Sequence, residues 1–193
     1  MLYHGTTKSN ADSIKKEGFN IEIPSIVEVE RNRKYQNKTI GSLGYGLYTF
    51  ENNYQLAYDF AKKYDSVNPT VFEINVEFPD NSLLDLTQDK MNNLFNKFCS
   101  IQNNTKHGEM IYNQIRKTKK VNTYAGIMIE LFILFLQRKY KFKILGVKRW
   151  EETFLPGIRY SIGPNAIEVT IRDTKLVSKS NFKIVRKENS DES

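Results

Sequence analysis

Two segments of this chain alternate strictly between apolar and polar residues, and they constrain its fold more than any other feature. Residues 71–78 and 167–172 show this pattern, which is typical of strands with one buried face. Further short strands are expected at 2–4 and 182–185. Because strands lie towards both ends of the sequence with helices between them, the sequence predicts an α+β fold whose sheet brings the ends of the chain together.

A short helix is expected directly after the first strand. It spans residues 9–19, where Ser9 or Asn10 can cap its start and Gly18 can end it.

The centre of the chain is less regular. Residues 20–44 are polar and aperiodic, as expected of a mobile loop beside a functional site. A glycine-led strand at 44–50 then runs into an amphipathic helix at 53–64. Two or three helices are expected within 87–140, the last of them apolar.

Size and composition favour one domain. The chain has 193 residues, of which 39% are hydrophobic and 12% aromatic, enough for one core without disulfides or a structural metal. We predict a single domain over 1–185 with a helical insertion at about 87–140, followed by a polar tail at 186–193.

The sequence favours a cytoplasmic protein that does not enter a membrane. The single cysteine, Cys99, has no disulfide or zinc-ligand companion and suits a reducing compartment. The first residues lack the basic and apolar regions of a secretory signal. The most apolar run, 125–136, is shorter than the roughly 20 residues that a bilayer requires and contains Glu130.

The net charge of +7 would favour an encounter with a polyanion such as RNA, DNA or an anionic cofactor. The alternative is that Lys and Arg are spread over the surface only as a solvated shell. Charge alone does not separate these two interpretations.

Three short segments carry residues suited to a binding site. They lie at 2–6, 44–50 and 165–173, and their notable residues are His4-Gly5-Thr6, Tyr48 and Glu168. Within the last segment Glu168 faces away from the apolar face that Ile167 and Val169 share, because successive strand side chains point to opposite sides.

The order and spacing of these segments resemble the His-Tyr-Glu branch of the ADP-ribosyltransferase superfamily, which includes the poly(ADP-ribose) polymerases and diphtheria toxin. The resemblance covers roughly residues 2–61 and 165–185. It rests on the following matches to the motifs of the branch: His4-Gly5-Thr6, Gly18-Phe19, Gly44-Tyr45-Gly46-Leu47-Tyr48, Glu168 and, five residues later, Asp173. It implies a split β-sheet core with flanking helices.

The resemblance implies that NAD⁺ is the co-substrate, without a metal, and that Glu168, His4 and Tyr48 are the catalytic residues. Cleavage of the bond between nicotinamide and ribose passes through an oxocarbenium-like state, so a carboxylate near the sugar is needed. Glu168 would bind the ribose 2′-hydroxyl and stabilise that cation. His4 would bind an adenosine ribose hydroxyl, and the Tyr48 ring would stack on nicotinamide.

Other residues would complete the cofactor site by resemblance. The main chain of Gly5 would bind the nicotinamide carboxamide, and Thr6 would assist. A second aromatic ring is expected from the helix after Tyr48, but Asp59 stands at the ungapped position, so Tyr58 and Phe60 are the candidates.

Each of these residues also has a purely structural interpretation. A lone histidine or tyrosine such as His4 or Tyr48 is more often a core residue than a ligand contact, and a strand glutamate such as Glu168 is usually only solvated. Their joint occurrence in the right order and local context favours the functional interpretation.

Two departures from the family pattern narrow the expected reaction. Ala166 stands two residues before Glu168, where arginine-modifying toxins carry Glu or Gln, so arginine is a less favoured acceptor. Leu56 replaces the serine of the polymerases, so we expect single transfers. The tRNA 2′-phosphotransferases share the His-Gly-Thr opening, but their phosphate-reading residues have no counterpart here.

The sequence therefore predicts a mono-ADP-ribosyltransferase that modifies a macromolecule. The basic stretches 31–38 and 116–120 slightly favour nucleic acid, RNA or DNA, over protein as the acceptor. Such an enzyme would suit a toxin of a toxin–antitoxin or phage-defence system, neutralised by an antitoxin protein. The alternatives are a protein ADP-ribosyltransferase, an NAD⁺ glycohydrolase and an inactive binding module of the same fold.

Overall fold

The computed structural model describes residues 1–24, 40–106, 108–110, 113, 121–153 and 164–185. The predicted α+β class is confirmed. In chain order the elements are β1 (Leu2–Thr6), α1 (Lys8–Glu17), β2 (Leu47–Glu51), α3 (Tyr54–Lys62), β3 (Thr70–Ile74), β4 (Leu83–Asp85), α4 (Asp89–Asn103), α6 (Val121–Tyr140), β5 (Gly146–Glu151), β6 (Ala166–Ile171), a 3₁₀ turn (Thr174–Leu176) and β7 (Phe182–Val185).

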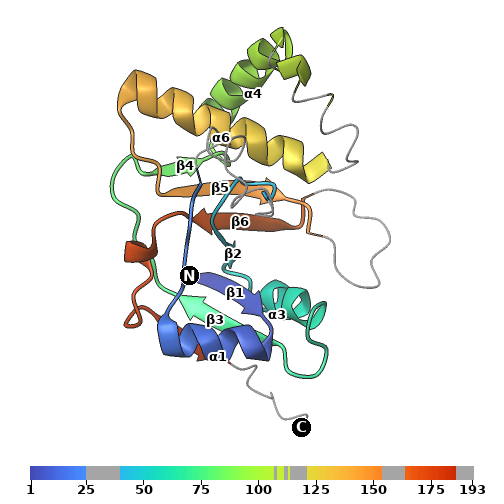
Figure 1. The fold of residues 1–193 in the computed structure, drawn as a ribbon, viewed down its shortest axis with the longest axis vertical. Helices are drawn as coiled ribbons and strands as arrows, with labels where there is room; N and C mark the ends of the chain where they lie inside the picture. Colours follow the sequence, from blue (N-terminus) through green and yellow to red (C-terminus); the bar gives the residue numbers. More distant parts are fainter. Residues whose placement is uncertain (25–39, 107, 111–112, 114–120, 154–163, 186–193) are drawn as a thin grey trace.

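The seven strands form one sheet in the order β4-β5-β6-β2-β1-β3-β7. Neighbouring strands are antiparallel except β4 and β5, which are parallel. Helices α4 and α6 lie at one end of the molecule beside β4 and β5, and α1 and α3 lie at the other end beside β1 and β3 (Figure 1). The first strand and the last two therefore share one sheet, as predicted from the presence of strands at both ends of the chain.

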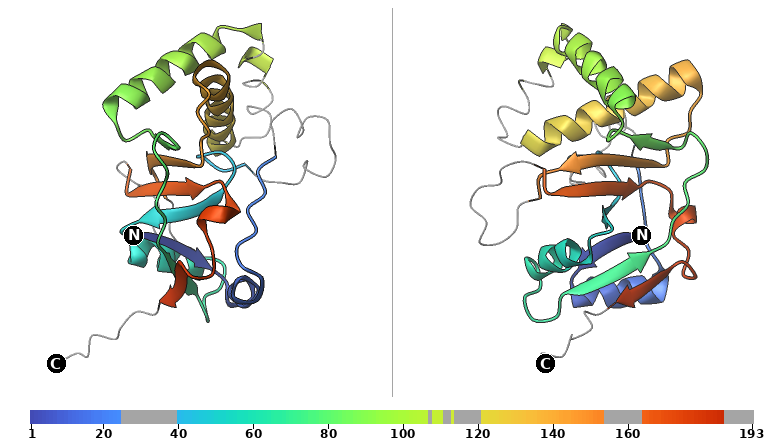
Figure 2. Two further views of the ribbon diagram at one scale, coloured as in Figure 1. Left: turned by 90° about the vertical axis from the view of Figure 1, so that its left-hand side faces the viewer. Right: turned by 180° about the vertical axis from the view of Figure 1, so that it is seen from behind.

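Hydrophobic residues cover both faces of the sheet. The α1 face buries Leu2, Phe72 and Ile171 against Ala11 and the following residues of the chain. We call the opposite side the α3 face, since α1 and α3 lie on opposite sides of β1 and β3 (Figure 2). Within the described helices, none is long and apolar enough to cross a membrane.

The α3 face carries two separate clusters. The α3 cluster joins helix α3 to Phe50 and Ala166. The α6 cluster joins helices α4 and α6 to Val147 of β5. Between these two clusters, the α3 face carries polar residues of β5 and β6, because cross-strand partners lie on the same side of a sheet.

The start of α1 differs from the prediction. Thr7 is the N-cap, and its side chain accepts a hydrogen bond from the Asn10 backbone at 3.3 Å, so Ser9 and Asn10 lie inside the helix. Gly18 ends the helix with φ of 85°, a conformation that favours glycine, and this prediction is confirmed.

The observed strand bounds differ most from the predicted ones in β2 and β3, while β1 runs on to Thr6 and β6 is shifted by one residue. β2 begins at Leu47, because the preceding residues form a turn in which Gly44 has φ of 81°. β3 ends at Ile74, not at residue 78. Ile74 pairs with Leu2, where β1 begins, so the neighbouring strand has no partner for the residues that follow.

Several predictions fall wholly or mostly outside the described residues. These are the loop at 20–44, whose residues 25–39 are not described, both basic stretches at 31–38 and 116–120, and the tail at 186–193. Helices α4 and α6 occupy the predicted helical insertion. Strands β4 and β5 were not predicted.

Candidate functional site

The candidate site begins where β1 and β2 stop pairing. Leu2 pairs with Glu51 and Tyr3 with Phe50, but β1 then continues beside β3 alone, up to Thr6. The two strands thus diverge after Tyr3.

The side chain of His4 bridges this divergence. Its Nδ1 lies 2.8 Å from the main-chain oxygen of Tyr48. A carbonyl oxygen only accepts hydrogen bonds, so Nδ1 carries the proton and donates it. Burial lowers the pKa of His4, and the bond to Tyr48 only partly opposes this effect. The imidazole is therefore neutral at pH 7, and its Nε2 is left as a hydrogen-bond acceptor.

Glu168 lies two strands away from the opening of the chain. It pairs with Phe50 of β2, which in turn pairs with Tyr3 of β1. Two strand spacings separate the Cα atoms of Tyr3 and Glu168 by about 10 Å. The late glutamate and the early histidine therefore occupy the same region of the sheet, although 164 positions separate them in the sequence.

The three predicted catalytic residues do not all share one face. Tyr48 pairs with Thr170, two residues after Glu168, so Tyr48 and Glu168 both lie on the α3 face. His4 lies on the α1 face, which it shares with Leu2 two residues earlier in β1. Its ring meets Phe19 edge-on at 5.6 Å between centroids. His4 is therefore connected to the face that carries Tyr48 and Glu168 by its hydrogen bond to the main chain of Tyr48.

The carboxylate of Glu168 is mostly buried and hydrogen-bonded. Its Oε1 accepts a bond of 2.7 Å from the hydroxyl of Thr153. Burial raises the pKa of Glu168 to about 7; the Thr153 bond opposes this rise, and the negative charge of Glu151 adds to it. Near neutral pH this carboxyl group exchanges readily between its two charge states.

Thr153 is fixed by a double contact with Asn165. The Thr153 backbone donates to Asn165 Oδ1 at 2.8 Å, and Asn165 Nδ2 donates to the Thr153 carbonyl at 2.9 Å. The Asn165 backbone also donates to the Glu151 carbonyl at 3.0 Å. These three bonds join the chain just after β5 to the chain just before β6. They place the Thr153 hydroxyl beside Glu168.

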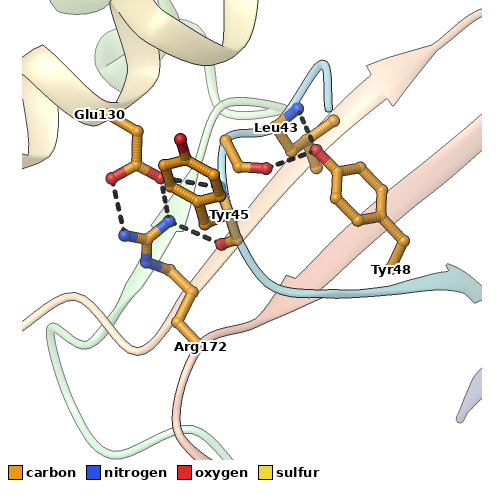
Figure 3. A network of polar contacts seen from close by, with 6 residues as sticks. Leu43, Tyr45, Tyr48, Glu130 and Arg172 are labelled. Carbon is orange, nitrogen blue, oxygen red and sulfur yellow. Dashed lines mark hydrogen bonds and ion pairs between the residues drawn. The ribbon is translucent and has the colours of Figure 1, made fainter. Parts of the chain in front are cut away.

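Tyr48 is anchored by its hydroxyl group. The hydroxyl accepts from the Leu43 backbone and donates to the Gly44 carbonyl, both at 2.8 Å (Figure 3). The ring packs against the α6 cluster, and burial raises the pKa of Tyr48 strongly, so the phenol stays protonated. The ring orientation is therefore set by the turn before β2.

A buried ion pair holds the turn that precedes β2. Arg172 donates to both carboxylate oxygens of Glu130, at 2.5 and 2.8 Å, and each of the two side chains is only 6% exposed (Figure 3). The same pair binds the backbone of Tyr45, whose N–H donates to Glu130 and whose carbonyl accepts from Arg172, both at 2.8 Å. Helix α6, the turn and the end of β6 thus meet at one charged contact.

Gly5 and Thr6 lie under helices. A Cβ on Gly5 would stand 1.9 Å from the carbonyl oxygen of Ala57, so α3 approaches β1 closely only because residue 5 has no side chain. Thr6 is buried, and its hydroxyl accepts from Asn10 of α1 at 3.4 Å.

The two candidates for a second aromatic contact both belong to the α3 cluster. Tyr58 stacks on Tyr54, with centroids 6.2 Å apart. Phe60 meets Phe50 edge-on at 5.8 Å. Because Phe50 pairs with Glu168, Phe60 contacts the immediate neighbour of the carboxylate.

Three residues beside Glu168 were missed by sequence reasoning. They are Arg149 and Glu151 of β5, and Thr153 just after it. Their spacing of two is a strand signal, but all three are polar, and strand prediction relied on apolar alternation. Among the described residues, no group of three His, Cys, Asp or Glu side chains is arranged to hold a metal ion.

Comparisons of the chain with models of known protein families, with curated proteins and with solved structures found no match. A functional proposal therefore depends on the motif resemblance and on the geometry of the site.

Proposed function

We propose that this protein is a cytoplasmic NAD⁺-dependent mono-ADP-ribosyltransferase with the split-sheet fold of the His-Tyr-Glu branch. One observation carries the proposal: Tyr48 and Glu168 lie on one face of adjacent strands, and His4 bonds the Tyr48 main chain where β1 and β2 diverge. An extended dinucleotide that crosses this divergence can reach an imidazole on one side and a carboxylate on the other.

The chemistry assigned to Glu168 follows from its charge. When the bond between C1′ of the ribose and nicotinamide breaks, its electron pair goes to the nicotinamide ring and the sugar becomes cationic. An ionised Glu168 stabilises that cation more than it stabilises bound NAD⁺. The acceptor then forms its bond to C1′ and releases its proton to water. Since the pKa of Glu168 is about 7, turnover rises with pH through neutrality.

His4 and Tyr48 bind the co-substrate in this proposal. The neutral His4 ring has its Nδ1 engaged, so its Nε2 accepts from a ribose hydroxyl. Tyr48 offers an aromatic ring whose position is fixed by two hydrogen bonds. By resemblance, the main chain of Gly5 would bind the nicotinamide carboxamide with the help of Thr6, and Tyr58 and Phe60 remain the proposed sources of the second ring.

For the acceptor we favour a nucleic acid over a protein, because the chain carries a net charge of +7. A cytoplasmic enzyme that consumes NAD⁺ and modifies nucleic acid would act as the toxin of a toxin–antitoxin or phage-defence system. An antitoxin protein would then be its natural partner.

The test uses NAD⁺ labelled in its adenylate part, with RNA, DNA or cell extract as the acceptor. We expect free nicotinamide and labelled nucleic acid. Glu168→Gln should lower turnover by about 10²–10³-fold with little change in NAD⁺ binding, since the lost charge acts mainly in the transition state. The matched control is Glu152→Gln, because Glu152 is an exposed neighbour at the end of β5.

Each result has a clear meaning. Nicotinamide release without a labelled polymer would identify an NAD⁺ glycohydrolase, and label on protein would identify a protein-modifying enzyme. An absence of NAD⁺ turnover would leave a binding module, and an unchanged rate in Glu168→Gln would reject the catalytic assignment.

A further inference from the structure

We propose that Thr153 and Glu151 are positioning residues for Glu168 and act on it in opposite directions: Thr153 holds its carboxylate by a hydrogen bond, and Glu151 opposes its ionisation by like charge. The inference rests on the proposed function for its catalytic meaning. The contacts among the three residues do not depend on that function.

The contact of Thr153 with Glu168 is built from both sides. Thr153 is only 6% exposed, and its hydroxyl donates to Glu168 at 2.7 Å. Its backbone is held on both its N–H and C=O groups by the side chain of Asn165. A hydroxyl fixed in this way donates to the charged form of a carboxylate more strongly than to the neutral form. Thr153 therefore favours ionised Glu168.

Glu151 approaches Glu168 through the register of β5 and β6. Arg149 pairs with Glu168 and Glu151 pairs with Ala166, so Glu151 is the diagonal neighbour of Glu168 on the α3 face. Such neighbours have Cα atoms about 7–8 Å apart, within the reach of two glutamate side chains. Glu151 is 15% exposed, so little water screens the repulsion between the two carboxylates.

Glu151 is itself only partly compensated. Its Oε1 forms an ion pair of 3.3 Å with the Arg149 guanidinium, but this oxygen is buried and has no hydrogen bond. Burial raises the pKa of Glu151, while Arg149 and a side-chain hydrogen bond to Ser42 lower it. Arg149 and Ser42 thus favour the charged form of the Glu151 carboxyl, and in that form it repels the charge of Glu168.

The other ionisable groups around Glu168 are neutral or have charged partners of their own. On β2, the Tyr48 phenol stays neutral. On α6, Glu130 is neutralised by its bidentate contact with Arg172. Arg149 of β5 directs its guanidinium to Glu151. Burial sets the raised pKa of Glu168, and among the neighbouring side chains Thr153 and Glu151 shift that pKa in opposite directions.

The direct test measures the titration of Glu168 in the protein without NAD⁺, by carboxyl ¹³C NMR. The signal of Glu168 is the one that disappears in Glu168→Gln. We expect Thr153→Val to raise its midpoint by about one pH unit and Glu151→Gln to lower it by a similar amount. Thr153→Ser should restore the wild-type midpoint, and Glu152→Gln should leave it unchanged. Thermal melts of each variant confirm that it is folded.

The second arm follows nicotinamide release as a function of pH. The acid limb of the kcat/KM profile should move to higher pH in Thr153→Val and to lower pH in Glu151→Gln. The NAD⁺ affinity should change little in both variants. An unchanged Glu168 midpoint in both folded variants overturns the inference, even if the wild-type enzyme is active. Shifted midpoints without any NAD⁺ turnover support the coupling of the three residues and reject the proposed reaction.

Discussion

Thr49 and Thr170 are buried threonines on neighbouring strands, but their hydroxyl groups have different surroundings. The hydroxyl of Thr49 donates to the Val169 carbonyl at 2.7 Å. The hydroxyl of Thr170 is buried without a hydrogen-bond partner among the residues described. A buried polar atom that loses water and gains no partner reduces stability.

This difference predicts opposite results for one conservative substitution. Thr49→Val should lower the free energy of unfolding by about 1–2 kcal/mol, because it removes a buried hydrogen bond and leaves a carbonyl with one partner fewer. Thr170→Val should leave stability unchanged or raise it by up to about 1 kcal/mol. Urea unfolding of both variants measures this, and equal losses would show that the Thr170 hydroxyl has a partner in solution.

At the scale of single residues, the sequence predicted the three motif residues but not the groups around them. His4, Tyr48 and Glu168 lie in short segments with recognisable order. The hydroxyl that binds Glu168 comes from Thr153, whose position depends on strand pairing and on the side chain of Asn165. Such a contact arises from the register of two strands, which no local pattern contains.

At the scale of elements, the prediction located the strands with one apolar face, although not the end of β3, and it missed β5, where charges are paired across strands. β5 lies between β4 and β6, yet its sequence contains Lys148 and Arg149, and its Trp150 is 51% exposed. Lys148 is accommodated by an ion pair of 2.8 Å with Glu51 of β2. That partner lies 97 residues away, so the polar sequence concealed an internal strand.

The packing of α3 on β1 gives a prediction at the same scale. Gly5→Ala should destabilise the protein by about 3 kcal/mol, because the new methyl group would collide with the Ala57 carbonyl and displace the helix. Gly18→Ala is the comparison without a steric clash: it adds a methyl group in open space, and its cost of about 1–3 kcal/mol comes from the backbone alone, because φ of 85° with ψ of 178° is readily adopted only by glycine. Thermal unfolding compares the two, and a smaller loss at Gly5 would mean that α3 lies farther from β1.

At the scale of the whole molecule, the Glu130–Arg172 pair joins the helical insertion to the rest of the sheet. Glu130 belongs to α6, Arg172 follows β6, and both bind the backbone of Tyr45 before β2. The insertion therefore supports the turn that fixes Tyr48, although the motif resemblance does not extend to it.

Removal of one charge from this pair should be costly. Glu130→Gln should lower stability by about 3 kcal/mol, because it leaves the buried Arg172 charge uncompensated. Asp12→Asn, which breaks the exposed pair of Lys8 and Asp12, should cost less than about 0.5 kcal/mol. Denaturant unfolding measures both, and similar losses would contradict a special role for the buried pair.

The contact between Thr153 and Asn165 ties the end of β5 to the start of β6 directly. Its three hydrogen bonds belong to residues 151, 153 and 165, and two of them use the side chain of Asn165. One amide side chain therefore fixes where a hydroxyl twelve residues earlier in the chain meets the carboxylate of Glu168.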